Sequence, residues 1–84
     1  MQERINEGYT VTDSIRVQND EFVIGHHPTA PAPYVVWRVS NGNSYYWGHY
    51  FNDRWAALED LAERVIDAVR LHRTLTGKEG EGDA

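Results

Sequence analysis

The Asn41-Gly42 pair constrains the fold more than any other part of this sequence. It separates two runs that are rich in β-branched and aromatic residues, 34–40 and 44–51. A type I′ turn needs positive φ at both of its central residues, and Asn-Gly is a pair that readily adopts it. The pattern therefore predicts an antiparallel hairpin whose strands cover 34–40 and 44–51.

The register of this hairpin determines which side chains share a face of the sheet. A two-residue loop pairs Arg38 with Tyr45 and gives one face Val35, Trp37, Val39, Tyr46, Gly48 and Tyr50. The opposite face then carries Tyr34, Val36, Arg38, Tyr45, Trp47 and His49. We expect a helix to cover the first face, because it is the cleaner apolar surface. A three-residue loop over 41–43 is the alternative, and it would turn Trp47 inward.

An earlier hairpin is predicted by the period-two alternation over 9–17 and 21–27. A loop at Asn19-Asp20 sets its register, because both residues tolerate positive φ. Its core face then carries Ile15, Val17, Phe22 and Ile24, and its other face is mostly polar. Three prolines between 28 and 33 predict a stiff, extended connection to the second hairpin, since proline cannot donate to a sheet ladder.

A long C-terminal helix is predicted over 53–76, after the N-cap residues Asn52 and Asp53. Its inner side carries Leu58, Leu61, Ala62, Val65, Ala68, Val69 and His72. Such a helix is about 36 Å long, whereas a seven-residue strand spans about 23 Å, so the last turns should extend past the sheet. At the other end, the helical spacing within 1–7 and the stop residue Gly8 predict a short N-terminal helix.

Together these elements predict an α+β fold. It is a four-stranded antiparallel meander packed on one face by the long helix. Residues 1–76 form one domain in this prediction, and 77–84, where glycine alternates with charged residues, form a disordered acidic tail. A chain of 84 residues buries a modest fraction of its surface, so oligomerisation is one way to reinforce its stability.

Composition narrows the function classes. The chain has no cysteine, which excludes a disulfide framework and a thiolate zinc site. It has no apolar run of about 18 to 20 residues and begins without the pattern of a secretory signal, so we expect a cytoplasmic protein. The net charge of -5 disfavours nucleic acid as a partner, because phosphates are bound through cationic surfaces.

The sequence does not place residues at the spacing that catalysis or metal binding requires. The four histidines include no His-x-His pair, and Asp13 opposite His26 in the predicted register is typical of a structural cross-strand contact. There is no Gly-x-Ser-x-Gly motif, and the paired carboxylates belong to the exposed side of the helix. We therefore predict a non-enzymatic protein without a metal or cofactor, and infer no small-molecule substrate.

The second hairpin holds most of the ten aromatic residues, and this points to binding. A single helix covers only one face of a sheet, so the other face needs the N-terminal turn, a second copy or a foreign partner. We predict that the contact surface consists of Tyr34, Arg38, Tyr45, Trp47 and His49, with a protein partner or a homodimer as its occupant. Stacking of single-stranded bases on the aromatic face is an alternative.

Three stretches of the sequence, YVVW at 34–37, YYWGHYF at 45–51 and AALEDL at 56–61, resemble small uncharacterised proteins of bacterial mobile genetic elements. The resemblance covers about residues 34–64 and brings no catalytic residues with it. It implies a context in which small acidic proteins often inhibit or adapt host machinery. An acidic inhibitor of a host nucleic-acid-handling complex, such as a CRISPR effector, is therefore a second alternative.

Overall fold

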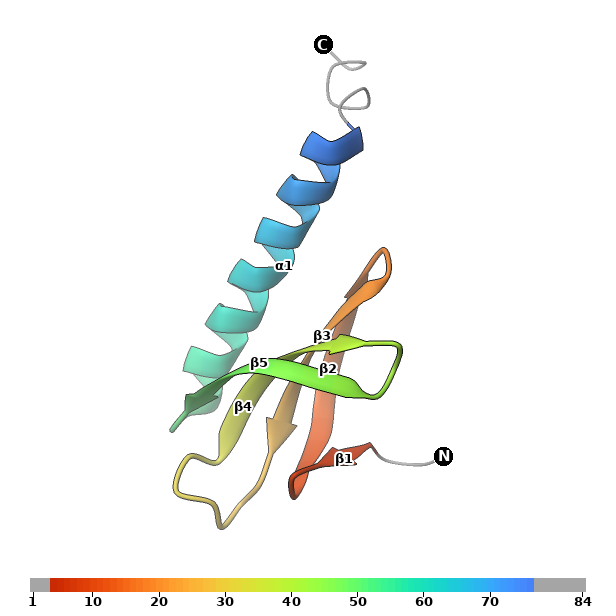
Figure 1. Ribbon diagram of the computed structural model, residues 1–84. Coiled ribbons are helices and arrows are strands. Elements are labelled where there is room, and N and C mark those ends of the chain that lie inside the picture. The colour runs from red at the N-terminus through yellow and green to blue at the C-terminus, as the bar shows by residue number, and fades with distance from the viewer. Residues whose placement is uncertain (1–3, 77–84) are drawn as a thin grey trace.

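A computed structural model describes residues 4–76 as an antiparallel sheet packed against one long helix (Figure 1). The elements are β1 (Ile5–Asn6), β2 (Tyr9–Val17), β3 (Asp20–His26), β4 (Tyr34–Ser40), β5 (Ser44–Phe51) and α1 (Arg54–Thr76). Neighbouring strands in the chain are neighbours in the sheet, in the order β1-β2-β3-β4-β5. The predicted α+β meander is confirmed. The tail predicted over 77–84 lies outside the described residues.

The N-terminal segment is a strand, so the short helix predicted there is wrong over residues 4–7, while 1–3 lie outside the described residues. Asn6 pairs with Tyr9 across a turn in which Glu7 has φ 52° and Gly8 has φ 86°. Gly8 thus supplies the positive φ of a two-residue hairpin turn and does not end a helix. The sheet has five strands as a result.

A partly buried ion pair ties this extra strand to the middle of the sheet. Glu21 is only 7% exposed, and both of its carboxylate oxygens accept from Arg4, at 3.0 and 2.7 Å. Ser14 on β2 donates a further hydrogen bond to the same carboxylate. The hydrogen bonds from Arg4 are the main cause that lowers the pKa of Glu21 to about 2.

The first hairpin forms with a different loop from the one predicted. Val17 pairs with Asp20, so the loop is Gln18-Asn19, and Gln18 takes the left-handed conformation with φ 57°. This register differs from the predicted one by two residues, which preserves the two faces because side chains alternate with period two. The opposite face is not mostly polar, however, since Tyr9, Val11 and Val23 on it belong to a second core.

The second hairpin has the three-residue loop over 41–43, so the two-residue register is wrong. Ser40 pairs with Ser44, and Val39 pairs with Tyr45. The ladder then shifts between Val36 and Arg38, where β5 inserts one extra residue as a β-bulge. Beyond the bulge the side chains of β5 return to the faces expected from a two-residue loop, and Trp47 is not turned inward.

The helix covers the face opposite to the one we expected. Its core consists of Phe22, Ile24, Val36, Ala57 and Leu61, whereas Tyr9, Val23, Val35, Trp37 and Val39 form a second core on the other face. The sheet is curled, and Figure 1 shows β5 crossing in front of β2 and β3. This curl closes the second core without a helix. Tyr9 spans it, with its hydroxyl donating to the Ala32 carbonyl at 2.7 Å and its ring at 5.7 Å from Trp37.

The helix begins where predicted, since Asp53 accepts a hydrogen bond from the backbone amide of Ala56 at 2.9 Å. Ala57 and Leu61 are buried, while Ala62 and Val69, which were predicted to face inward, are exposed. Figure 1 shows the last turns extending past the sheet, as expected from the relative lengths. Within residues 4–76 no helix combines the length and apolar composition needed to cross a membrane.

Candidate binding site between the β5 bulge and the helix

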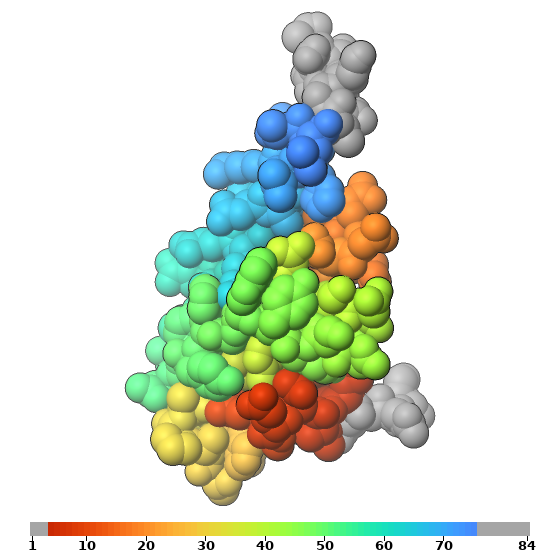
Figure 2. Space-filling model, viewed as in Figure 1, coloured from red at the N-terminus to blue at the C-terminus, as the bar shows by residue number. Residues whose placement is uncertain are grey.

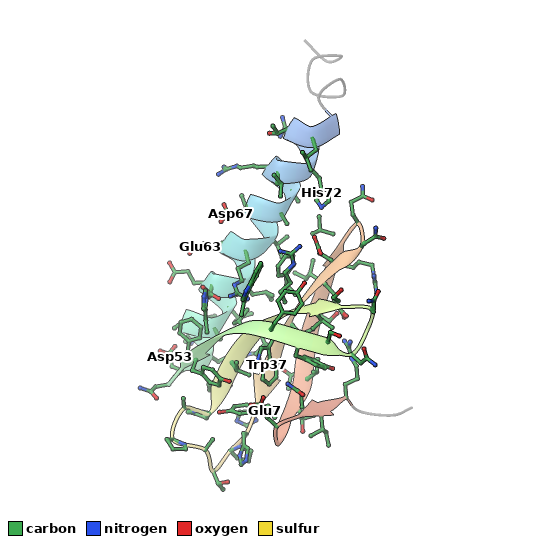
Figure 3. The ribbon with its side chains drawn as sticks, in the orientation of Figure 1. Glu7, Trp37, Asp53, Glu63, Asp67 and His72 are labelled. Atoms are coloured by element: carbon green, nitrogen blue, oxygen red, sulfur yellow. The ribbon has the colours of Figure 1, made fainter. Side chains whose placement is uncertain are left out.

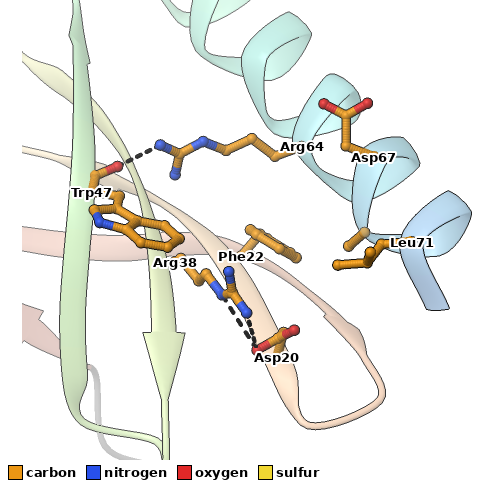
Figure 4. A pocket seen from close by; sticks show the side chains of 8 residues that line it. Asp20, Phe22, Arg38, Trp47, Arg64, Asp67 and Leu71 are labelled. Carbon is orange, nitrogen blue, oxygen red and sulfur yellow. Dashed lines mark hydrogen bonds and ion pairs between the residues drawn. The ribbon is translucent and has the colours of Figure 1, made fainter. Parts of the chain in front are cut away.

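An open groove of about 210 Å³ lies between β5 and the C-terminal half of α1 (Figure 4). We call it the Trp47 groove. It is lined by Asp20, Phe22, Arg38, Trp47, Arg64, Asp67, Ala68 and Leu71. Figure 2 shows the green side chains of β5 standing between the helix and the orange tip of the β2–β3 hairpin. The lining combines apolar side chains with two arginines and two aspartates.

Trp47 is the unusual residue of this groove. It occupies the β-bulge with φ 56°, a left-handed conformation that is rare for a bulky side chain, and it is 63% exposed. The next residue, Gly48, packs against the core indole, and a Cβ there would lie 2.9 Å from Nε1 of Trp37. The bulge therefore puts the residue without a side chain over the core and directs the Trp47 indole outward.

We expect Trp47→Gly to be more stable than Trp47→Ala, because alanine keeps the left-handed strain that glycine removes. The difference in the free energy of unfolding should be about 1 kcal/mol. Urea denaturation of the two variants at neutral pH measures it. An alanine variant at least as stable as the glycine variant would show that the left-handed conformation of residue 47 carries no strain.

Arg38 is held in a fixed position at the base of the groove. Its guanidinium donates to Asp20 Oδ1 at 2.8 and 3.3 Å, and its central carbon lies 5.2 Å from the Trp47 ring (Figure 4). The same group lies 5.9 Å from Tyr46 and 6.0 Å from Phe22. Cation–π contacts of this kind stabilise both the charge and the orientation of the rings.

Arg64 connects the helix to the bulge. One of its terminal nitrogens donates to the backbone oxygen of Trp47 and lies 3.0 Å from His49 Nε2. Its Nε lies 3.5 Å from Asp60 on the same helix. Burial is the largest influence on this guanidinium and lowers its pKa, with a further lowering from the charge of Arg38 and an opposing effect of Asp60.

His49 and Asp60 form a pair that superficially resembles a catalytic base with its orienting acid. His49 Nδ1 lies 3.0 Å from Asp60 Oδ2. Arg64 has only donors to offer, so Nε2 of His49 accepts from it and the ring proton is on Nδ1, facing Asp60. Both ring nitrogens are thereby engaged within the protein. The pair holds Arg64 in place beside the bulge.

The structure brings together only part of the predicted contact surface. Arg38 and Trp47 line the groove, and His49 lies beside it through its contact with Arg64. Tyr34 instead stacks on His26, with ring centroids 4.8 Å apart, and it packs against the core under the helix. Tyr45 lies on the opposite face of the sheet, 5.3 Å from Trp37, because the three-residue loop reverses its side.

The sequence reasoning missed most of the residues that complete the groove. Arg64, Ala68 and Leu71 follow one another at helical spacing, which was a usable signal for one helix face. Nothing local connects them to Phe22 or Arg38, because the contact depends on which face of the sheet the helix covers.

Outside the groove, Asp13 binds Arg54 at 3.1 Å, and hydrogen bonds from Arg54 are the main cause that lowers the pKa of Asp13.

The predicted pairing of Asp13 with His26 is wrong, since His26 pairs with Thr10 across a shifted ladder. Among residues 4–76 no three side chains of histidine, aspartate or glutamate are grouped so that they could hold a metal ion.

Comparison with protein-family models, curated proteins and solved structures finds no match for the chain. Function is therefore inferred from the groove itself.

Proposed function

We propose that this chain is a non-enzymatic protein-interaction module whose Trp47 groove holds a side chain of a partner protein. The observation that carries the proposal is the exposed indole of Trp47, kept in a left-handed backbone conformation at a β-bulge. Unfavourable backbone conformations of bulky residues are concentrated at functional sites. β-bulges also re-aim side chains beside such sites.

The size of the groove supports a side chain as its occupant. Pockets for cofactors and small ligands usually measure about 300 to 1,000 Å³. The Trp47 groove, at about 210 Å³, is smaller and open, as suits one large side chain inserted from another protein. Tryptophan, tyrosine and arginine are also the residue types that dominate binding hot spots, and Trp47, Tyr46 and Arg38 contact one another here.

The charges of the groove indicate the kind of side chain that fits. Arg38 and Arg64 are balanced by Asp20 and Asp67, so the lining has no net charge. A strongly anionic ligand such as a phosphate backbone gains little from a balanced site. We propose an aromatic or long aliphatic anchor, packed on Trp47 and Leu71, whose polar end bonds to one of the charged groups.

Affinity capture from the source cell tests the proposal when it compares variants of the groove with a remote control. The wild type should recover one dominant protein, whereas Trp47→Ala and Arg38→Gln should bind it about thirtyfold more weakly, equivalent to about 2 kcal/mol. Ile5→Ala is the matched control, because Ile5 is exposed to a similar extent, 61%, on the far edge strand. Its affinity should equal that of the wild type.

Circular dichroism of each variant separates lost binding from lost folding. Retention of the partner by a folded Trp47→Ala variant would overturn the proposal. If the capture recovers only nucleic acid, and this nucleic acid stays bound at about 200 mM salt, single-stranded nucleic-acid binding is favoured instead.

A further inference from the structure

The helix α1 has more apolar surface than the sheet covers. Its exposed apolar residues on one side, which we call the helix stripe, are Trp55, Ala62, Ile66 and Val69. Trp55 is 80% exposed and Ile66 is 47% exposed, while Leu58 and Val65 are half-buried against the sheet. The stripe is separate from the Trp47 groove, whose helical residues are Arg64, Asp67, Ala68 and Leu71.

The spacing of the stripe is that of a coiled-coil seam. Residues 55, 62 and 69 recur at intervals of seven, as the a positions of a heptad do, while Leu58 and Val65 at the d positions border the sheet. Residues 59, 66 and 73 then occupy the flanking e positions on the side away from the sheet. A surface of this pattern is suited to another helix and not to a small ligand.

The charges of α1 indicate which helix would pack on the stripe. Acidic residues lie in the first part of α1, at Glu59 and Glu63, and basic residues lie in the last part, at Arg70 and Arg73. Figure 3 shows Glu63 on the outer side of α1, away from the strands. An identical helix laid antiparallel brings each acidic part against a basic part, whereas a parallel copy opposes like charges.

The e positions set the register of two antiparallel copies of α1. A two-fold axis through Ile66 pairs Ile66 with its own copy and places Glu59 of each chain opposite Arg73 of the other, seven residues on either side of the axis. We propose that the chain forms a two-fold symmetric homodimer through the helix stripe, with the two α1 helices antiparallel. This interface goes beyond the proposed function, because it uses a different surface and leaves the Trp47 groove open.

Sedimentation of the full chain, from low micromolar concentration to about 100 μM, tests the dimer by mass action. The wild type should sediment with twice the mass of one chain at the upper concentrations. Ile66→Glu should raise the dissociation constant at least about tenfold, because it brings two like charges together at the axis. Ile5→Glu introduces the same substitution at an exposed isoleucine remote from α1 and should leave the dimer unchanged.

A charge exchange tests the antiparallel register independently of folding. Glu59→Arg and Arg73→Glu should each raise the dissociation constant by roughly three- to tenfold, and the two substitutions together should restore it. A wild type that remains a monomer throughout overturns the proposal. So does a dimer that survives Ile66→Glu, one that is lost equally in Ile5→Glu, or a double charge variant that shows no recovery.

Discussion

Replacing Trp37 by alanine should unfold the domain. The indole is 3% exposed and packs edge-on against Tyr9 and Tyr45 inside the curl of the sheet. Truncating a buried aromatic side chain to alanine costs about 3 to 5 kcal/mol. A single domain of this size has a free energy of unfolding of only a few kcal/mol, so the loss removes most or all of it. Circular dichroism and urea denaturation at 25 °C measure the effect.

Trp47→Ala is the matched control for this experiment, because it removes the same side chain from an exposed position ten residues away. We expect it to change the free energy of unfolding by less than about 1 kcal/mol. The comparison tests the observed register directly. If Trp47→Ala unfolds and Trp37→Ala does not, the faces of the second hairpin are assigned the wrong way round.

Acid should destabilise the protein chiefly through Glu21. The pKa of this carboxyl is about 2 in the folded protein, against an ordinary value of 4.5, so the unfolded chain binds the proton more readily. The stabilisation is complete above about pH 5 and is lost as the pH falls toward 2, and it amounts to about 2 to 3 kcal/mol. Glu21→Gln should be less stable than the wild type by this amount at pH 7 and equally stable near pH 2.

Urea denaturation at a series of pH values between 7 and 2 follows this convergence. Asp13→Asn serves as the control, since Asp13 has its own arginine partner but lies in a more exposed pair. This variant should lose less free energy of unfolding than Glu21→Gln does. Two parallel stability curves for wild type and Glu21→Gln across this range would contradict the role assigned to the Arg4–Glu21 pair.

Local chemistry was sufficient to predict β2 to β5 and the helix, but not β1. Asn41 and Gly42 carry positive φ in the loop, and the β4–β5 hairpin forms around them. Asp53 caps the helix and Thr76 ends it, at the residues expected from capping and spacing. Each of these signals acts over a few residues, because it concerns backbone conformation or the side chains of one turn. Fold class and element order follow from such signals.

The register could not be predicted in the same way. Asn41-Gly42 fits a two-residue loop, and the added residue Asn43 and the bulge at Trp47 changed the pairing twice within one hairpin. The bulge depends on packing, since Gly48 allows Trp37 to approach the backbone of β5. The N-terminal strand was misread for a related reason, because Gly8 is equally suited to ending a helix and to turning a hairpin.

The sequence by itself therefore determined the strands from Tyr9 to Phe51, the helix and its cap, and the aromatic character of the second hairpin. Only the tertiary structure decided which face the helix covers. The sheet curls and closes one core with Tyr9, so the helix packs on the other face. That choice brings Arg64 and Leu71 to Trp47 and Phe22 and creates the groove. Contacts between segments so far apart in the chain depend on the global curvature of the sheet, which no local pattern encodes.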